Sequence, residues 1–106
     1  MNVNFELYRI FYTVANTLNI TKASHELLIS QPAISKSIKN LEESLGGQLF
    51  IRTKRGVILT DEGVELYKYI KQAMEYIYNR LNNPLEAKVY YNKAKTKIFK
   101  SILNRI

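Results

Sequence analysis

Residues 30–42 read Ser30-Gln31-Pro32-Ala33-Ile34-Ser35-Lys36-Ser37-Ile38-Lys39-Asn40-Leu41-Glu42 and contain both the start signal and the periodicity of an α-helix. Ser30 is a favourable N-cap, and Pro32 is tolerated in a first helical turn because its missing N–H has no intrahelical partner there. Apolar residues recur at spacings of four, three and four and share one helix face: Ile34, Ile38, Leu41 and Leu45. Gly46-Gly47 then ends the helix.

Two further helices are predicted before this one. The first spans about Phe5 to Asn19, and its apolar residues lie at helical spacing: Leu7, Ile10, Phe11, Val14, Ala15 and Leu18. The second is short, from about Thr21 to Leu28, with Thr21 as its cap. We expect its buried face to consist of Ala23, Leu27 and Leu28. A short helix, a tight turn and a second helix form a helix-turn-helix, here over about residues 20–39.

The outer face of the helix that begins at Ser30 is small, polar and positive, which suits contact with DNA. In a helix-turn-helix the second helix enters the major groove, where Gln31 can bond adenine through two atoms. Ser30 and Ser35 are short enough to let the helix sit deep, and Lys36 and Lys39 can reach phosphates or a guanine. The alternative is an ordinary solvated face, in which Lys39 pairs with an acid one turn later.

A β-hairpin is predicted over about residues 49–59. Two short β-prone runs, 49–53 and 57–59, flank the loop Lys54-Arg55-Gly56. The loop places two adjacent positive charges at the tip, where Lys54 and Arg55 would contact the flanking DNA backbone or the minor groove. A generic polar loop is the alternative interpretation.

A long helix is predicted from residue 61 to about 82, with Thr60 as its cap and Asn82-Asn83-Pro84 at its end. Five residues recur at spacings of three and four and form a seam over about two heptads: Tyr67, Ile70, Met74, Ile77 and Leu81. At about 33 Å, this helix is longer than so small a domain can cover. We therefore expect a homodimer through the 61–82 helix, with packing on the first helix of the same chain as the alternative.

The tail, residues 84–106, is predicted to be a short basic amphipathic helix. It carries six basic residues against Glu86, a net charge of +5, whereas residues 1–83 carry the remaining +2 of the chain's +7. The tail can extend the dimer interface, bind DNA nonspecifically or lie on an anionic membrane surface. We favour packing against the 61–82 helix.

Composition narrows the function further. A net charge of +7 and a pI near 9.7 favour polyanionic partners, with nucleic acid first and an anionic membrane surface second. The chain has no cysteine and a single histidine, His25, so it offers no thiol nucleophile and no pair of histidines for a metal. We expect no enzymatic activity, no catalytic residue, no cofactor and no metal. Without a membrane-spanning segment or a signal peptide, a cytoplasmic location is expected.

The stretch from Phe11 to Gly63 resembles the DNA-binding domain of LysR-type transcriptional regulators. The densest match is the segment from Ser30 to Glu42, and the other matching positions extend on both sides: Phe11, Val14, Ala15, Ala23, Leu27, Leu28, Leu45-Gly46, Leu49-Phe50, Arg52-Thr53, Arg55-Gly56, Leu59-Thr60 and Gly63. The resemblance covers roughly residues 4–82. It implies a fold that is mostly α with a small β-hairpin, a winged helix-turn-helix followed by a long linker helix that dimerises.

The resemblance also implies which residues contact double-stranded DNA. They are Ser30, Gln31, Pro32, Ser35 and Lys36 in the recognition helix and Arg55 in the wing. For Arg52 it leaves open a structural role or a contact to a backbone phosphate. We therefore predict a sequence-specific, dimeric DNA-binding transcriptional regulator. The alternative is a short form that acts as a dimerisation partner or inhibitor of full-length relatives.

The chain is expected to divide into three parts: a winged helix-turn-helix in 1–60, a linker helix in 61–83 and the tail in 84–106. Family members typically carry an effector-binding domain of about 200 residues after the linker helix, which the remaining residues are too few to form. We expect no small-molecule effector to bind this chain. A truncated regulator, a fragment with an altered end and a stand-alone DNA-binding variant all remain open.

Overall fold

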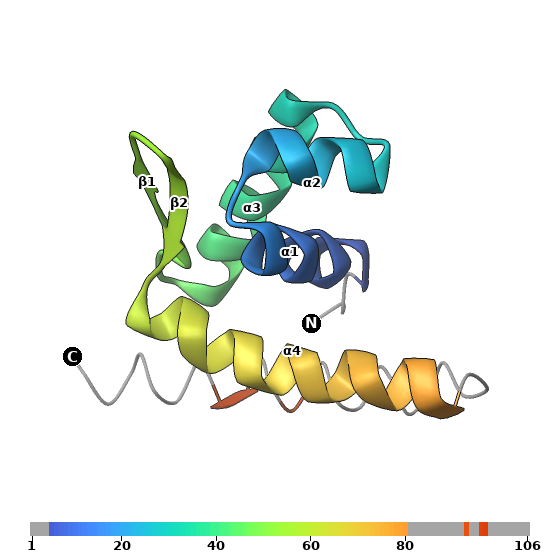
Figure 1. Ribbon diagram of the computed structural model, residues 1–106. Helices are drawn as coiled ribbons and strands as arrows, with labels where there is room; N and C mark the ends of the chain where they lie inside the picture. Colours follow the sequence, from blue (N-terminus) through green and yellow to red (C-terminus); the bar gives the residue numbers. More distant parts are fainter. Residues whose placement is uncertain (1–4, 81–92, 94–95, 98–106) are drawn as a thin grey trace.

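The computed structural model describes residues 5–80, 93 and 96–97. Its elements follow the order α1 (Phe5–Thr17), α2 (Ile20–Leu27), α3 (Gln31–Leu45), β1 (Phe50–Thr53), β2 (Gly56–Leu59) and α4 (Asp61–Arg80). The predicted fold, three helices, a two-stranded antiparallel hairpin and a long helix, is confirmed (Figure 1). The tail helix lies outside the described residues apart from helical positions 93 and 96–97. In the described part of the chain, no helix has the length and apolar character needed to cross a membrane.

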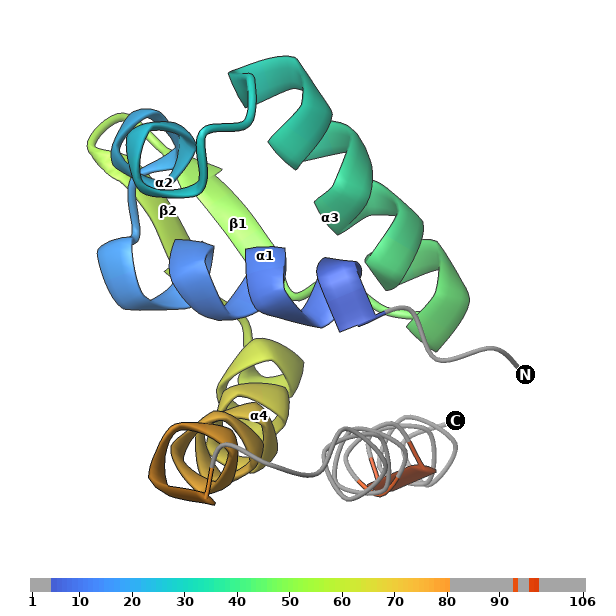
Figure 2. The same cartoon turned by 90° about the vertical axis from the view of Figure 1, so that its right-hand side faces the viewer.

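The first three helices pack around one core, and α4 runs beneath α1 (Figure 2). The predicted stripe of α3 is confirmed, because Ile34, Ile38, Leu41 and Leu45 are all buried. Phe11 of α1 meets Phe50 of β1 with ring centroids 5.3 Å apart, which joins the hairpin to the helices. Each such buried side chain stabilises the fold by roughly 1.5–3 kcal/mol.

The start of α2 differs from the prediction. The helix begins at Ile20, one residue before Thr21, and Asn19 is its N-cap. Asn19 Oδ1 accepts a hydrogen bond from the backbone N–H of Lys22 at 3.0 Å. Asn19 and Thr21 are both residue types that cap helices, so the sequence pattern alone did not separate them. Accordingly α1 ends at Thr17 and not at Asn19.

Leu18 and Leu28, which follow α1 and α2, are both exposed. The apolar pattern placed Leu18 on the apolar face of the first helix and predicted Leu28 to be buried. Each adopts a left-handed backbone conformation, with φ of 52° and 57° respectively. Leu28 ends α2 with its N–H bonded to the carbonyl of Ser24, and its side chain is 91% exposed. The helix ends one residue earlier than the periodicity suggested, so Leu28 leaves the buried face.

The Leu28→Asn variant is expected to be more stable than the natural chain by about 0.5–1 kcal/mol. A branched side chain in the left-handed region is strained, asparagine tolerates that region, and Leu28 loses almost no burial when replaced. Urea unfolding followed by circular dichroism measures the change. The matched control is Thr21→Asn, at an exposed position inside α2, which should not stabilise. An unchanged or lower midpoint for Leu28→Asn would contradict the prediction.

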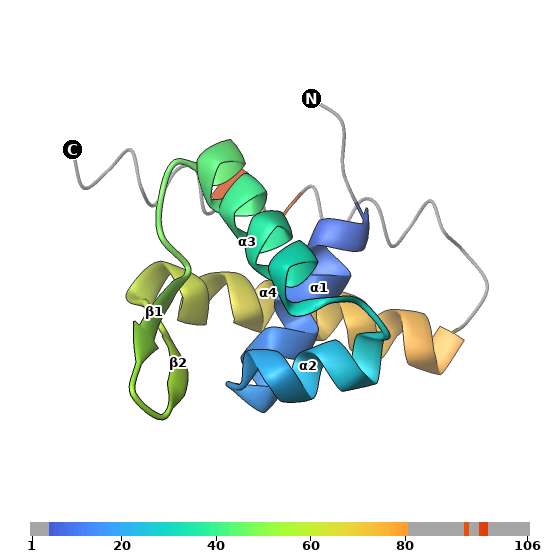
Figure 3. The ribbon, with the colours of Figure 1, turned by 90° about the horizontal axis from the view of Figure 1, so that it is seen from above.

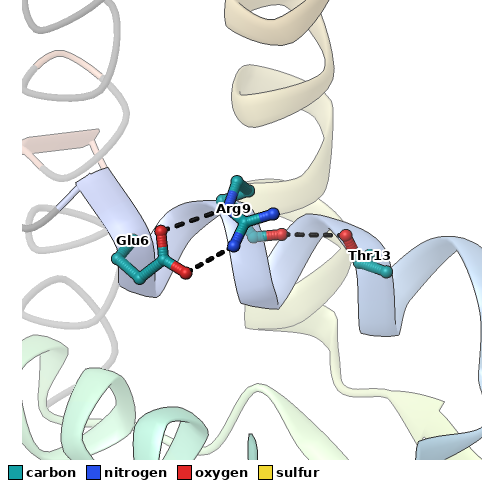
Figure 4. A network of polar contacts seen from close by, with 3 residues as sticks. All are labelled: Glu6, Arg9 and Thr13. Carbon is teal, nitrogen blue, oxygen red and sulfur yellow. Dashed lines mark hydrogen bonds and ion pairs between the residues drawn. The ribbon is translucent and has the colours of Figure 1, made fainter. Parts of the chain in front are cut away.

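A polar network with an exposed ion pair lies along α1 (Figure 4). The guanidinium of Arg9 donates to both carboxylate oxygens of Glu6, at 2.6 and 3.1 Å, and Thr13 Oγ1 donates to the Arg9 carbonyl at 3.1 Å. The hydrogen bond from Arg9 lowers the pKa of Glu6. An exposed pair of this kind adds only a few tenths of a kcal/mol.

The hairpin has a two-residue loop, one residue shorter than predicted. Gly56 belongs to β2 and pairs with Thr53, so only Lys54 and Arg55 form the turn. With φ of 142°, Gly56 adopts a conformation that other residues rarely reach, and a Cβ there would overlap the backbone carbonyl of Leu18. The next residue, Val57, donates its N–H to the same carbonyl at 3.2 Å. The hairpin is therefore held directly against the turn between α1 and α2.

The start of α4 is as predicted. Thr60 Oγ1 accepts from the N–H of Gly63 at 3.0 Å and donates to the carbonyl of Gln48 at 2.6 Å. A Cβ on Gly63 would overlap the carbonyl of Leu49, so glycine lets α4 begin close against the loop before β1.

Lys97 contacts α4 through Tyr69, because Lys97 Nζ lies 4.8 Å from the centre of the Tyr69 ring. This contact raises the pKa of Lys97 through the hydrogen bond to Tyr69.

Candidate nucleic-acid interface

The N-terminal half of α3 presents the side chains predicted to meet DNA. Ser30 is the N-cap, as expected, and its Oγ accepts from the N–H of Ala33 at 3.3 Å. The apolar stripe of α3 faces the core, so the opposite side of the helix faces away from it. On that side Ser30, Gln31, Pro32, Lys36 and Lys39 are exposed and Ser35 is half-buried.

The hairpin tip points away from α4, on the same side of the molecule as the start of α3 (Figure 1). Lys54 and Arg55 are both exposed. Thr53 orders the turn, because its Oγ1 accepts from the N–H of Arg55 at 3.3 Å and donates to the carbonyl of Gly56 at 3.2 Å. The two positive charges are thus presented on an ordered turn.

Two adjacent hollows lie beside the hairpin. The first, of about 310 Å³, lies between the hairpin and the start of α2, and its lining also includes Gln31 of α3 and Lys54 of the hairpin tip. The second, of about 370 Å³, is lined by Ser35, Lys39 and Glu42. Arg52 lines both. Figure 3 shows the hairpin on one side of α3 and α1 on the other.

Two side chains connect α3 to the hairpin, and the sequence pattern predicted neither contact. Glu42 Oε2 accepts from the backbone N–H of Leu49 at 2.6 Å and of Phe50 at 3.4 Å, which joins the end of α3 to the start of β1. Arg52 Nη2 donates to Ser35 Oγ at 2.7 Å. Both ties depend on how the hairpin folds back on α3, which no local spacing reveals.

Part of the predicted seam of α4 is covered within this chain. Ile70 and Met74 are buried in the core of this chain. Tyr67 stacks on Tyr12 with ring centres 5.8 Å apart, and its hydroxyl donates to Asn16 Oδ1 at 2.5 Å. These three residues follow the alternative expectation, packing against α1 of the same chain. The side chain of Ile77 and all of Leu81 lie outside the described residues.

This arrangement defines a winged helix-turn-helix, and sequence comparison identifies its family. Residues 5–64 match the model of bacterial regulatory helix-turn-helix proteins of the lysR family. The match covers more than half of the chain, so the chain belongs to this family. The resemblance inferred from the sequence is therefore confirmed.

Relatives and solved structures agree with this assignment. The chain is 46% identical over 96 residues to an uncharacterized HTH-type transcriptional regulator, YoaU, of Bacillus subtilis (strain 168), which covers 84% of this chain and 33% of that protein. It is 41% identical over 81 residues to the carbapenem-hydrolyzing beta-lactamase transcriptional activator of Enterobacter cloacae, over 76% of this chain and 28% of that protein.

Among solved structures, a complex of the BenM DNA-binding domain with the catB site 1 DNA matches with a TM-score of 0.69 and 35% identity. It covers 74% of this chain and 89% of that one. The expectation that the chain is not an enzyme is confirmed, because its relatives are transcriptional regulators and its fold is that of their DNA-binding domain. The chain spans about a quarter to a third of the length of the curated relatives it matches.

Proposed function

We propose that this chain recognises a specific double-stranded DNA sequence and regulates transcription as a dimer, with residues 1–60 as the DNA-binding part. The observation that carries the proposal is one hollow beside the hairpin whose lining includes both Gln31 of α3 and Lys54 of the hairpin tip. A helix that offers short polar side chains beside a basic wing tip suits a base-reading element flanked by phosphate contacts. The proposed DNA-binding residues are Ser30, Gln31, Pro32, Ser35, Lys36, Lys39, Lys54 and Arg55.

Selection of binding sites from a random duplex library by the purified chain tests this function. A recurrent sequence motif is the expected result. Fluorescence anisotropy over a salt series then compares the selected duplex with a scrambled one. Tighter binding to the selected duplex that persists as salt rises supports sequence-specific recognition, because phosphate contacts alone weaken steeply with salt. Equal, strongly salt-dependent binding to both duplexes, with no recurrent motif, would exclude it.

For the dimer we propose that the 61–82 helix pairs with a second copy, with its later seam residues, Ile77 and Leu81, as the contacts. Ile70 is unsuited to a test, because truncating it in the core would cost roughly 2–5 kcal/mol of stability. The Ile77→Lys variant is expected to halve the mass measured by analytical ultracentrifugation at micromolar concentration. Gln72→Lys, on an exposed position of α4, is the matched control and should leave the mass unchanged. A dimeric Ile77→Lys chain would refute this interface.

A further inference from the structure

We propose that Arg52 determines what Ser35 can read, by holding the Ser35 hydroxyl as a hydrogen-bond donor toward the DNA. This inference rests on the proposed function and assigns to Arg52 the role of a residue that positions another. The contact that suggests it is short: Arg52 Nη2 lies 2.7 Å from Ser35 Oγ, between residues 17 positions apart in the sequence. It is a direct contact between the wing and the recognition helix.

The position of Arg52 on the hairpin explains why it reaches α3. Arg52 pairs with Val57 across the two strands, and the neighbouring Ile51 pairs with Ile58. Side chains alternate between the two faces of a strand, so Arg52 and Val57 share the face toward the helices, and Ile51 and Ile58 lie on the other face. Val57 is buried on the first of these faces, whereas the longer Arg52 side chain extends to an exposed position. The guanidinium therefore crosses the gap between β1 and α3 and lines both hollows.

The chemistry of the two groups fixes the direction of the bond. A guanidinium carries only N–H donors, so Ser35 Oγ must be the acceptor. A serine hydroxyl also has one proton to donate, and in the described part of the chain this proton has no hydrogen-bond partner. The positive charge of Arg52 on one side of the oxygen favours an O–H directed to the other side, away from the hairpin.

A hydroxyl held in this way discriminates between bases. On its own, a serine can donate to or accept from a base edge, and so it reads little. As a donor, Ser35 favours the acceptor atoms of the major groove, which are guanine N7 and O6, adenine N7 and thymine O4. The amino group of cytosine is itself a donor and finds no acceptor in the O–H. It can meet only the second lone pair of Ser35 Oγ, which the nearby positive charge of Arg52 makes a poorer acceptor. Arg52 thereby turns an ambivalent side chain into one that disfavours cytosine.

The acid that lines the same hollow does not compete for Arg52. Glu42 Oε2 accepts two backbone N–H groups at the start of β1 and is committed to that junction. Lys39, which also lines this hollow, repels the guanidinium and adds no acceptor. In the described residues Ser35 is accordingly the side chain to which Arg52 donates.

Selection from a random duplex library tests the proposal with four proteins: the natural chain, Ser35→Ala, Arg52→Ala and the double variant. The Ser35→Ala selection identifies the base pair that Ser35 reads. Arg52→Ala is expected to relax preference at that same base pair, raising tolerance of cytosine about fivefold, the effect of one lost hydrogen bond. The double variant should relax it no further than Ser35→Ala alone. Thermal unfolding of each variant confirms that all four chains are folded.

The Arg55→Ala variant is the control for a simple phosphate contact, since it should weaken binding without altering any position of the motif. Arg52→Ala that behaves like Arg55→Ala, with the preference at the Ser35 base pair intact, would overturn the proposal. So would additive effects of the two substitutions at that base pair. A natural chain that selects no motif would refute the proposed function itself, which separates the two failures.

Discussion

The Gln31→Ala variant is expected to bind the selected DNA site roughly 5- to 150-fold more weakly, a loss of about 1–3 kcal/mol, and to accept other bases at one position. Gln31 is the first residue of α3, is exposed, and lines the hollow that it shares with Lys54. A carboxamide offers a donor and an acceptor side by side, which match the N6 and N7 atoms of adenine. Alanine removes both and leaves that base edge without a partner.

The Gln31→Ala variant should lose affinity for the selected duplex and keep its affinity for the scrambled one. In the described structure the Gln31 side chain makes no hydrogen bond, and alanine is a good helix former, so the fold should keep its stability. Anisotropy titrations with the selected and scrambled duplexes measure the two affinities, and urea unfolding checks the fold. Gln72→Ala, the same change on α4, is the matched control and should alter neither affinity. Equal losses on both duplexes would contradict a base-reading role for Gln31.

Local sequence signals were sufficient to predict the elements whose start, end and buried face are determined by neighbouring residues. The helix from Gln31 to Leu45 was predicted with its cap, its glycine end and its buried stripe, because each of these is determined within a few residues. The errors arose where two local signals compete. Asn19 and Thr21 both cap helices, and the choice between them depends on how α1 ends. The helical periodicity predicted Leu28 to be buried, but α2 ends at Leu27 and the Leu28 side chain is exposed.

The seam of α4 illustrates a different limit. Periodicity shows that Tyr67, Ile70 and Met74 share a face, but it does not say whether that face meets the same chain or a second copy. In the structure α1 covers these residues through Tyr12 and the core. The contact of Arg52 with Ser35 is likewise invisible to periodicity, because it joins a strand to a helix 17 positions away.

The double variant Lys54→Ala/Arg55→Ala is expected to weaken binding to every duplex, selected or scrambled, by a similar factor. Both side chains are exposed on the ordered turn at the hairpin tip, where they can reach backbone phosphates. If each neutralises one phosphate, the slope of log K against log salt should fall in magnitude by about two units. The corresponding loss of affinity for DNA is roughly 60-fold at 0.1 M salt and roughly 20-fold at 0.2 M salt.

A matched control distinguishes the effect of where these two charges lie from the effect of removing two charges anywhere on the chain. Lys68→Ala/Lys71→Ala also removes two positive charges, from exposed positions on α4, and both variants keep the six basic residues of 84–106. If the wing tip contacts DNA, the salt slope changes strongly in the hairpin variant alone, because a screened charge far from the phosphates releases no counterion. Equal changes in the two variants would mean that overall charge attracts the DNA and that the hairpin tip has no contact of its own.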